Sequence, residues 1–191
     1  INLYKKAPEQ ALAKMGISQI DDEMVNWHNT YEKGLMSSEA LTEHYLNKFP
    51  SLTALSFKQA WNSIILDFPQ HRLDWIIQLA KSKKYRLFLL SNTNDLHIEQ
   101  VIKNMDAMRY SQFQNCFERF YLSQQIHLRK PDLEIYDFVL QQDQLTAQET
   151  LFIDDTILNT AAASSMGIHT WHLEPGKEDI TQLFEIKKQL F

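Results

Sequence analysis

The sequence has little cysteine, no excess of positive charge and no long apolar run. Its 191 residues include one cysteine, Cys116, so an internal disulfide is excluded and a reducing cytoplasm is the expected location. The formal net charge of −5 argues against a nucleic-acid partner. The apolar runs are too short to span a bilayer, and no secretory signal is visible. These absences favour a cytoplasmic protein that works away from membranes and nucleic acids.

The composition is that of an ordinary globular domain. Hydrophobic residues make up 44% and charged residues 23% of the chain. The length suits one domain, or one domain with a small insertion. No internal repeat or low-complexity segment is present. The chain begins with Ile1 rather than Met, and we expect further residues to precede Ile1 in the native protein.

Residues 5–70 carry only helical patterns. Ser56 and Gln59 have the spacing of a capping box, and an apolar stripe from Phe57 to Phe68 follows at intervals of three to four residues. No strand pattern of any strength occurs in this region. The pattern predicts a small helical bundle.

After Pro69 the pattern alternates between strands and helices. Buried strands are predicted at residues 85–90, 117–122, 151–153 and 168–173, with helices between them. Such alternation predicts an α/β fold with a parallel sheet and right-handed crossovers.

Two adjacent carboxylates, Asp154 and Asp155, directly follow the strand predicted at 151–153. Ligands of open α/β sheets bind outside such strand ends. Two unit charges ~4 Å apart interact by about 4 kcal/mol at an effective dielectric of ~20, so the pair needs a neutralising cation or an added proton. Mg²⁺, which prefers oxygen ligands, is the natural partner. Helix capping is the alternative, but it accounts for one aspartate better than for two.

Two further groups follow strands or precede helices. Ser91 and Asn92 come after the strand predicted at 85–90, where a hydroxyl and free N–H groups can hold an anion. Simple helix capping is an equally good explanation of Ser91 alone. Lys130 precedes Pro131, which fixes where the lysine emerges at a helix start. The alternative for Lys130 is a solvated surface charge.

Taken together, three segments resemble the second, third and fourth signature motifs of the haloacid dehalogenase superfamily, in order and in spacing. The segments are Leu89-Leu90-Ser91-Asn92-Thr93-Asn94, then Leu122-Ser123 with Arg129-Lys130-Pro131, then Phe152-Ile153-Asp154-Asp155 with Asn159. The resemblance extends over the whole chain and is greatest to bacterial sugar-phosphate phosphatases. It implies a three-layer, Rossmann-like parallel sheet over residues 71–191, with an all-helical cap domain near the N-terminus at residues 5–70.

The resemblance also implies roles for individual residues. Ser91 and Asn92 would bind the phosphoryl group, and Lys130 would steady the nucleophile and the transferred phosphate. Asp155 would ligate Mg²⁺, and Asp154 would support either the metal or Lys130. Asn159 would contact the aspartates and help to position them without touching the substrate itself. The implied reaction is hydrolysis of a small phosphorylated metabolite, such as a sugar phosphate, through an aspartyl-phosphate.

One part of the family pattern is absent. The first motif, Asp-x-Asp, carries the nucleophile and the acid–base group in that superfamily, and no Asp-x-Asp occurs in these residues. Its strand would lie centrally in the sheet, so we expect roughly 10–20 additional residues upstream of Ile1. The alternative is a non-catalytic binding module that keeps the fold. A metal-free 2-haloacid dehalogenase fits less well, because the aspartate pair favours a metal.

The predicted cap would select the substrate by closing over the site. Its candidate contacts are Trp27, His28, Tyr31, Glu32 and Trp61, although cap core is the stronger alternative for each aromatic residue. The turn formed by Glu32, Lys33 and Gly34 is placed where related caps reach the site. His169 and His172 have no third ligand nearby, which argues against a metal site there. The sequence leaves the oligomeric state open between monomer and dimer.

Overall fold

A computed structural model describes residues 1–191 and divides into two compact units, residues 1–127 and residues 128–191. The first unit contains eight helices and two strands, and the second contains three α-helices, short 3₁₀ turns and two strands. No helix is both long enough and apolar enough to cross a membrane. The predicted division at residue 70 stays a prediction.

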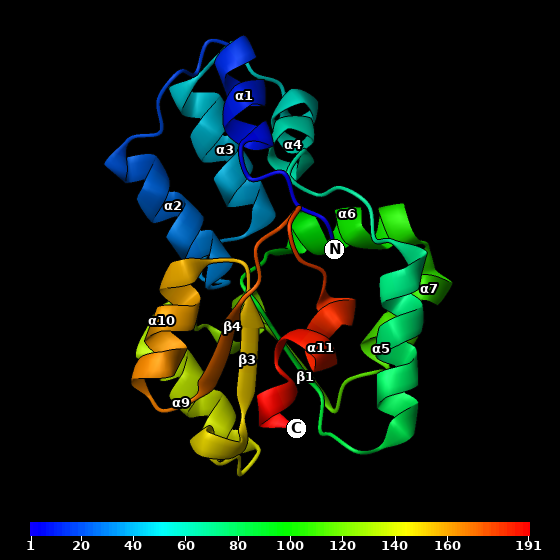
Figure 1. Cartoon of the computed structure of the whole chain (residues 1–191). Helices are drawn as coiled ribbons and strands as arrows, with labels where there is room; N and C mark the ends of the chain where they lie inside the picture. Colours follow the sequence, from blue (N-terminus) through cyan, green and yellow to red (C-terminus); the bar gives the residue numbers. More distant parts are fainter. The chain divides into compact units, whose positions relative to one another are not determined.

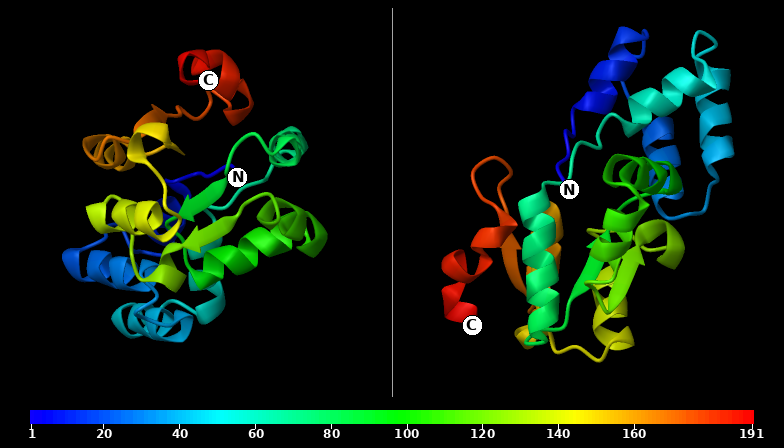
Figure 2. Two further views of the ribbon diagram at one scale, coloured as in Figure 1. Left: turned by 90° about the horizontal axis from the view of Figure 1, so that it is seen from below. Right: turned by 90° about the vertical axis from the view of Figure 1, so that its right-hand side faces the viewer.

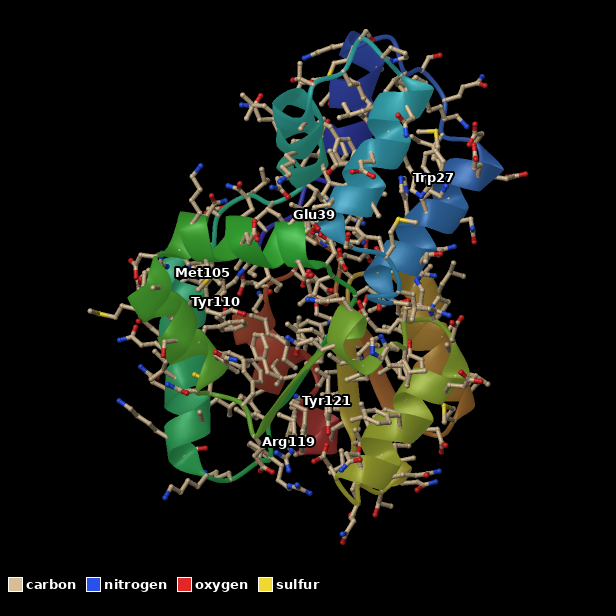
Figure 3. The ribbon with its side chains drawn as sticks, turned by 180° about the vertical axis from the view of Figure 1, so that it is seen from behind. Trp27, Glu39, Met105, Tyr110, Arg119 and Tyr121 are labelled. Atoms are coloured by element: carbon tan, nitrogen blue, oxygen red, sulfur yellow. The ribbon has the colours of Figure 1, made fainter.

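Four helices occupy the first part of the first unit, in blue to cyan in Figure 1. They are α1 (Ala7–Lys14), α2 (Asp22–Glu32), α3 (Ser38–Lys48) and α4 (Ala54–Asn62). Asp21 and Ser37 cap α2 and α3 by accepting hydrogen bonds from backbone N–H groups, as expected of such residues at helix starts. The apolar faces of these helices form one cluster that also includes Leu96. Figure 3 shows Trp27 in this cluster, where α2 faces α3.

The capping box of α4 differs from the predicted one. Thr53 accepts from the Ser56 backbone N–H, and the Ser56 hydroxyl accepts in return from the Thr53 backbone N–H. The predicted pair, Ser56 and Gln59, is therefore wrong by one turn. Thr53 has the extended backbone that an N-cap needs, whereas Ser56 is already inside the helix.

A short antiparallel ladder joins the chain segments on either side of these four helices. Leu3 pairs with Ile65, and the Asn2 backbone N–H donates to the Asp67 carbonyl at 2.8 Å. The Leu66 N–H returns a bond to the Asn2 carbonyl at 3.0 Å. The segments that enter and leave the helical region are thereby held side by side.

The rest of the first unit is built around two parallel strands. Their elements are α5 (Gln70–Ser82), β1 (Phe88–Ser91), α6 (Asp95–Met105), α7 (Ala107–Gln114), β2 (Arg119–Leu122) and α8 (Ser123–Ile126). β1 and β2 lie side by side in Figure 2, with Ser91 in register with Leu122. A second apolar cluster, centred on Leu73, Val101 and Phe113, joins α5, α6 and α7. Met105 and Tyr110 lie where α6 meets α7 (Figure 3).

The second unit is a parallel β–α–β arrangement. It contains α9 (Leu133–Gln142), β3 (Leu151–Asp154), α10 (Ile157–Ser165), β4 (His169–His172) and α11 (Leu183–Ile186). β3 pairs with β4 in parallel, with Asp154 in register with His172. α10 packs against both strands and contacts α9 (Figure 1). The chain therefore places Asp154 at the carboxyl end of a parallel strand, as the sequence predicts.

The strands are less buried than predicted. All four residues of β1 and all four residues of β3 have intermediate exposure. Each strand pairs with one neighbour only, so each two-stranded sheet covers one edge of its strands. The prediction that these strands are buried is wrong for residues 1–191, and the edge left by single pairing is the physical reason.

Candidate active site

The central feature of the second unit is a nearly buried ion pair. The Lys130 Nζ lies 2.6 Å from Asp154 Oδ2, and the two side chains are only 7% and 8% exposed. The other Asp154 oxygen accepts from the Thr156 backbone N–H at 2.8 Å and from Asn159 Nδ2 at 3.0 Å. Both carboxylate oxygens of Asp154 are thus engaged in holding Lys130 and the start of α10.

The local sequence explains how these groups meet. Asp154 ends β3, and the turn at Thr156 starts α10, which brings Asn159 back over the strand end. The Lys130 ammonium lies 5.3 Å from the centre of the Phe152 ring. Tyr136, on α9, donates its hydroxyl hydrogen to the Asn159 carbonyl oxygen at 2.8 Å. This hydrogen bond connects α9 to α10, the helix that carries Asn159.

Burial and charge act in opposite directions on Asp154. Burial alone would raise the pKa of this carboxyl group, but the Lys130 ammonium, together with hydrogen bonds from Thr156 and Asn159, outweighs burial and lowers the pKa. Asp154 is therefore ionised at neutral pH. An ammonium so held is a fixed positive charge, and fixed positive charges stabilise phosphoryl groups effectively.

Asp155 is placed differently from Asp154. It is half-buried, and its Oδ1 lies 3.5 Å from the Thr156 hydroxyl. A carboxylate next to the strand end has the oxygen chemistry that a hard divalent cation requires. No group of three or more His, Cys, Asp or Glu side chains gathers in a way that could hold a metal. Asp155 thus fits a magnesium site as one ligand of a set that needs further oxygen donors.

In the first unit, Ser91 ends β1 and the loop after it leads into α6. Asn94, not Ser91, caps that helix, because Asn94 Oδ1 accepts from the His97 backbone N–H at 3.0 Å. The Ser91 hydroxyl makes only a 3.4 Å contact with the neighbouring Asn92 carbonyl. Helix capping, the alternative explanation of Ser91, is therefore excluded by the structure.

Ser123, the first residue of α8, holds this loop; the sequence placed Ser123 in the third motif but gave it no role. Its hydroxyl accepts from the Thr93 backbone N–H at 2.9 Å and donates to the Thr93 carbonyl at 3.1 Å. The side chain is fully buried. Its position directly after an apolar strand was the available signal, since polar residues at strand ends are enriched in sites of α/β proteins.

The structure therefore brings together Lys130, Asp154 and Asn159, all in the second unit. Lys130 is buried and paired, so the alternative of a solvated surface charge is excluded. Ser91 and Asn92 belong to the first unit. Their meeting with Lys130 stays a prediction, as do the roles assigned to Asp154 and Asp155 at a metal.

Three of the candidate substrate-binding aromatic residues lie in the helical core. Trp27, Tyr31 and Trp61 are all buried members of the first apolar cluster. Packing accounts for them, which is the alternative that the sequence left open. His28 is half-buried, and its Nε2 lies 2.7 Å from the Tyr45 hydroxyl. Tyr31 also accepts, through its hydroxyl, from the Leu96 backbone N–H at the start of α6.

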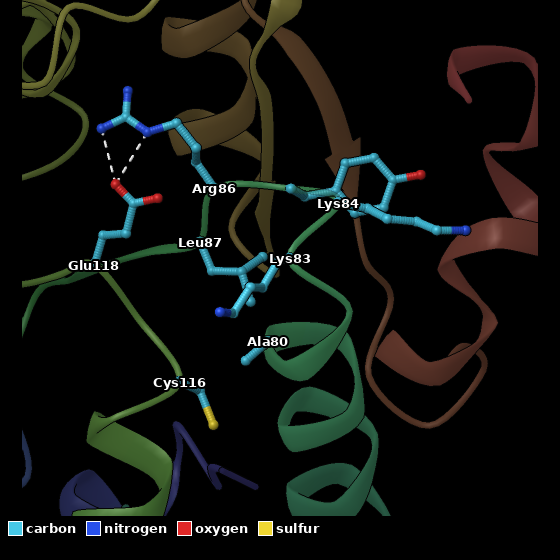
Figure 4. Close-up of a pocket in the computed structure, with 8 residues that line it drawn as sticks. Ala80, Lys83, Lys84, Arg86, Leu87, Cys116 and Glu118 are labelled. Carbon is cyan, nitrogen blue, oxygen red and sulfur yellow. Dashed lines mark hydrogen bonds and ion pairs between the residues drawn. The ribbon is translucent and has the colours of Figure 1, made fainter.

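A cavity of about 300 Å³ opens at the other end of β1 (Figure 4). It is lined by the end of α5, residues 84–87, Cys116 and Glu118. Arg86 and Glu118 form an ion pair at its rim, with an N–O distance of 2.8 Å. Burial raises the pKa of the Cys116 thiol, which keeps it protonated and unreactive. The cavity precedes β1, whereas Ser91 ends it, so this cavity is not the predicted phosphate site.

Residues 3–172 match the family model described as haloacid dehalogenase-like hydrolase. The chain belongs to this family. The match includes Ser91, Lys130, Asp154 and Asp155, the residues on which the resemblance was based. The family assignment made from the sequence and the α/β, Rossmann-like fold class are thereby confirmed.

Solved and curated relatives cover nearly all of the chain. A D-ribitol-5-phosphate phosphatase of Bacteroides thetaiotaomicron is 29% identical over 184 residues, covering 93% of this chain and 88% of the relative. A haloacid dehalogenase family enzyme of the same organism, solved as a magnesium complex, is 32% identical, with a TM-score of 0.83 over 96% of this chain and 92% of that one. Its complex with magnesium and inorganic phosphate has a TM-score of 0.79 at 30% identity, over 96% and 93% of the two chains.

Proposed function

We propose that the protein is a Mg²⁺-dependent phosphatase of the cytoplasm that hydrolyses a small phosphorylated metabolite. The observation that carries the proposal is the buried Lys130–Asp154 pair at the end of β3, with a second carboxylate, Asp155, directly beside it. A buried ammonium held by a carboxylate is suited to binding phosphoryl oxygens, and the adjacent aspartate to binding a cation.

Each residue of the proposed site has a distinct task. Lys130 offers its ammonium to the phosphoryl oxygens, and Asp154 fixes the position and charge of Lys130. For Ser91 and Asn92, at the end of β1, the proposed task is phosphoryl binding. Asp155 is the metal ligand that this chain supplies. A Mg²⁺ ion held by Asp155 and further oxygen donors would supply positive charge that stabilises the phosphoryl group.

Named relatives support both the activity and the metal. The D-ribitol-5-phosphate phosphatase is a phosphoric monoester hydrolase of similar length, and the solved family enzyme binds magnesium and phosphate. These relatives favour a small phosphorylated alcohol as the substrate class. We also propose that residues 5–70, which are helical apart from their connections, act as the cap that selects the substrate.

The nucleophile of this reaction is an aspartate that residues 1–191 do not supply through an Asp-x-Asp motif. We propose that residues encoded upstream of Ile1 supply it, on a strand next to β1. The single pairing of β1 and of β3 supports this, because each strand has an edge where another strand could pair. The missing motif also favours the second candidate, a binding module that keeps the fold without catalysis.

The test is an assay of the full-length gene product for phosphate release. The substrates are D-ribitol 5-phosphate and a panel of sugar phosphates, each with Mg²⁺ and with a chelator. Release that requires Mg²⁺ supports the phosphatase. Binding of the same esters without any release identifies the binding module, and halide release from 2-haloacids without Mg²⁺ identifies a dehalogenase.

A further inference from the structure

Gln124, the second residue of α8, carries a buried acceptor that nothing in the structure satisfies. The side chain is 8% exposed, and its Oε1 has no hydrogen-bond partner. Its Nε2 donates to Asp95 Oδ1 at 3.4 Å. The amide orientation is therefore fixed, because turning it over would set a carbonyl oxygen against a carboxylate. More than 90% of buried polar groups in native proteins are paired, so this oxygen is an exception that needs a cause.

The unpaired oxygen lies at the junction between the helical region and the loop after β1. Gln124 directly follows Ser123, whose hydroxyl holds Thr93 in that loop. On the other side, Gly34 packs so closely on the Gln124 carbonyl that an added Cβ would lie 2.0 Å from the carbonyl oxygen. The Lys33 carbonyl oxygen lies 2.8 Å from the Nδ1 of His127 at the end of α8.

The chemistry around Gln124 limits what its partner can be. A carbonyl oxygen accepts hydrogen bonds, so the partner must be a donor. The Asp95 carboxylate beside the amide disfavours an anion, which excludes the phosphate group itself. A hydroxyl group fits both conditions. Gln124 also adjoins Ser123, which holds Thr93 in the loop that begins at Ser91.

We propose that Gln124 Oε1 accepts a hydrogen bond from a hydroxyl of the substrate's alcohol portion, and so selects polyol or sugar phosphates over unsubstituted alkyl phosphates. This inference rests on the proposed phosphatase function and narrows its substrate class. Gln124 is then a specificity-determining residue whose acceptor stays unsatisfied until the substrate binds. Sites of this kind reject substrates that lack the donor, since the buried group is then left unpaired.

The test compares two esters of equal chain length in the full-length, magnesium-loaded protein. D-ribitol 5-phosphate carries hydroxyl groups, and pentyl phosphate carries none. The Gln124→Met variant keeps the side-chain volume and removes the acceptor. It should raise the KM for D-ribitol 5-phosphate at least tenfold and leave the KM for pentyl phosphate within about twofold. Its melting temperature without substrate should be unchanged or higher, because a buried unpaired carbonyl has been removed.

The matched control is Gln125→Met, because Gln125 is the exposed neighbour on the same helix. It should change neither KM. The inference would be overturned if Gln124→Met changed the KM of both esters equally. It would also be overturned if neither KM changed, a result that would indicate a buried water as the partner of Oε1. A drop in melting temperature together with loss of both activities would also overturn it, by showing a structural role.

A failure of the proposed function gives a different result. If the wild type releases phosphate from neither ester, titration calorimetry with D-ribitol 5-phosphate still measures the role of Gln124. Binding at least tenfold tighter in the wild type than in Gln124→Met supports the hydroxyl contact in a binding module. Equal binding, or no binding, refutes it.

Discussion

At the scale of single residues, the account depends on Lys130 and Asp154. Two opposite charges that are nearly removed from water are stable because each offsets the other, and Thr156 and Asn159 also donate hydrogen bonds to the carboxylate. Removing one partner leaves a buried charge without compensation. The Asp154 carboxyl has a lowered pKa, so the pair persists through neutral pH.

The single substitutions Lys130→Met and Asp154→Leu should each lower the free energy of unfolding by about 3–5 kcal/mol. The double variant should recover most of that loss, because neither charge then remains buried alone. All three should lack phosphatase activity in the full-length protein. Urea denaturation measures the stabilities, and phosphate release measures the activity.

The control is an exposed pair in the same unit with the same N–O distance. Lys177 and Glu174 lie 2.6 Å apart, and both side chains are about half exposed or more. Lys177→Met should leave the urea midpoint nearly unchanged, because solvent screens such pairs. If Lys130→Met lowers the free energy of unfolding no more than Lys177→Met does, the buried ion pair is not important for stability.

The sequence identified Lys130, Asp154 and Asp155 as candidates. It could not decide whether Asp154 pairs with Lys130 or supports a metal. Asp154 and Lys130 are 24 positions apart, and the choice between metal ligand and lysine partner depends on distances in the fold. The burial of Lys130 likewise depends on tertiary contacts, such as the Phe152 ring that lies 5.3 Å from its ammonium. Gln124 carried no signal at all, since an unsatisfied oxygen is visible only in three dimensions.

At the scale of elements, the turn after α2 is fixed against α8. Gly34 has a φ of +64°, a conformation that favours glycine, and a Cβ there would lie 2.0 Å from the Gln124 carbonyl oxygen. Gly16 also has a positive φ, +91°, but nothing lies within 4 Å of its Cβ position. The two glycines share a positive φ, which would strain any substituted residue, and they differ in the contact.

Gly34→Ala should therefore destabilise the protein more than Gly16→Ala does. Backbone strain alone costs roughly 1–2 kcal/mol in each variant, and the contact with Gln124 adds to that cost only at position 34. Urea denaturation followed by tryptophan fluorescence measures both. Equal losses in the two variants would show that the turn does not pack closely on α8.

Whether a segment forms a helix or a strand was more predictable than where it ends or how exposed it is. β1, β2, β3 and β4 all lie within three residues of the predicted strands, because apolar runs bounded by polar turns mark strands well. α7 was not predicted, since Asp106 caps it from a positive φ that no sequence pattern signals. The exposure of β1 and β3 depends on pairing, which the sequence of one strand does not contain.

At the scale of the whole molecule, two half-buried histidines, His28 and His97, link stability to pH. Burial lowers the pKa of His28 and of His97 to about 4. The His97 ring nitrogens face the Asn94 amide and the Trp61 carbonyl, at 3.1 and 3.3 Å. His28 faces the Tyr45 hydroxyl. Both rings must stay neutral in the folded state.

The folded protein binds fewer protons than the unfolded chain between the folded value of about 4 and the unfolded value of ~6.5. Stability should therefore fall as the pH drops from about 6.5 to about 4, by roughly 1–3 kcal/mol for each histidine. At still lower pH, protonation of Asp154 should remove the Lys130 pair and add to the loss. Melting temperatures across this pH range measure the effect.

The double variant His28→Gln/His97→Gln should flatten this dependence between pH 4 and 6.5. The exposed His169 is the control, and His169→Gln should leave the dependence unchanged. A wild-type melting temperature that stays constant across the range would contradict the assignment of half-buried neutral rings.

The family and fold class of the molecule were predictable from three spaced motifs, whereas the arrangement of its parts was not. The motifs specify which strand ends carry polar groups, but Ser91 and Lys130 lie in separate compact units. The identity of the substrate is likewise not specified by these motifs.

The most direct test of the account is a Mg²⁺ titration of phosphate release by the full-length protein and its Asp155→Asn variant. The substitution keeps the size of the side chain and removes its charge. We expect the wild type to require Mg²⁺ and the variant to lose turnover by roughly a hundredfold or more, because Asp155 is the proposed metal ligand. A variant with the wild-type rate and the wild-type response to Mg²⁺ would contradict the assignment of the active site.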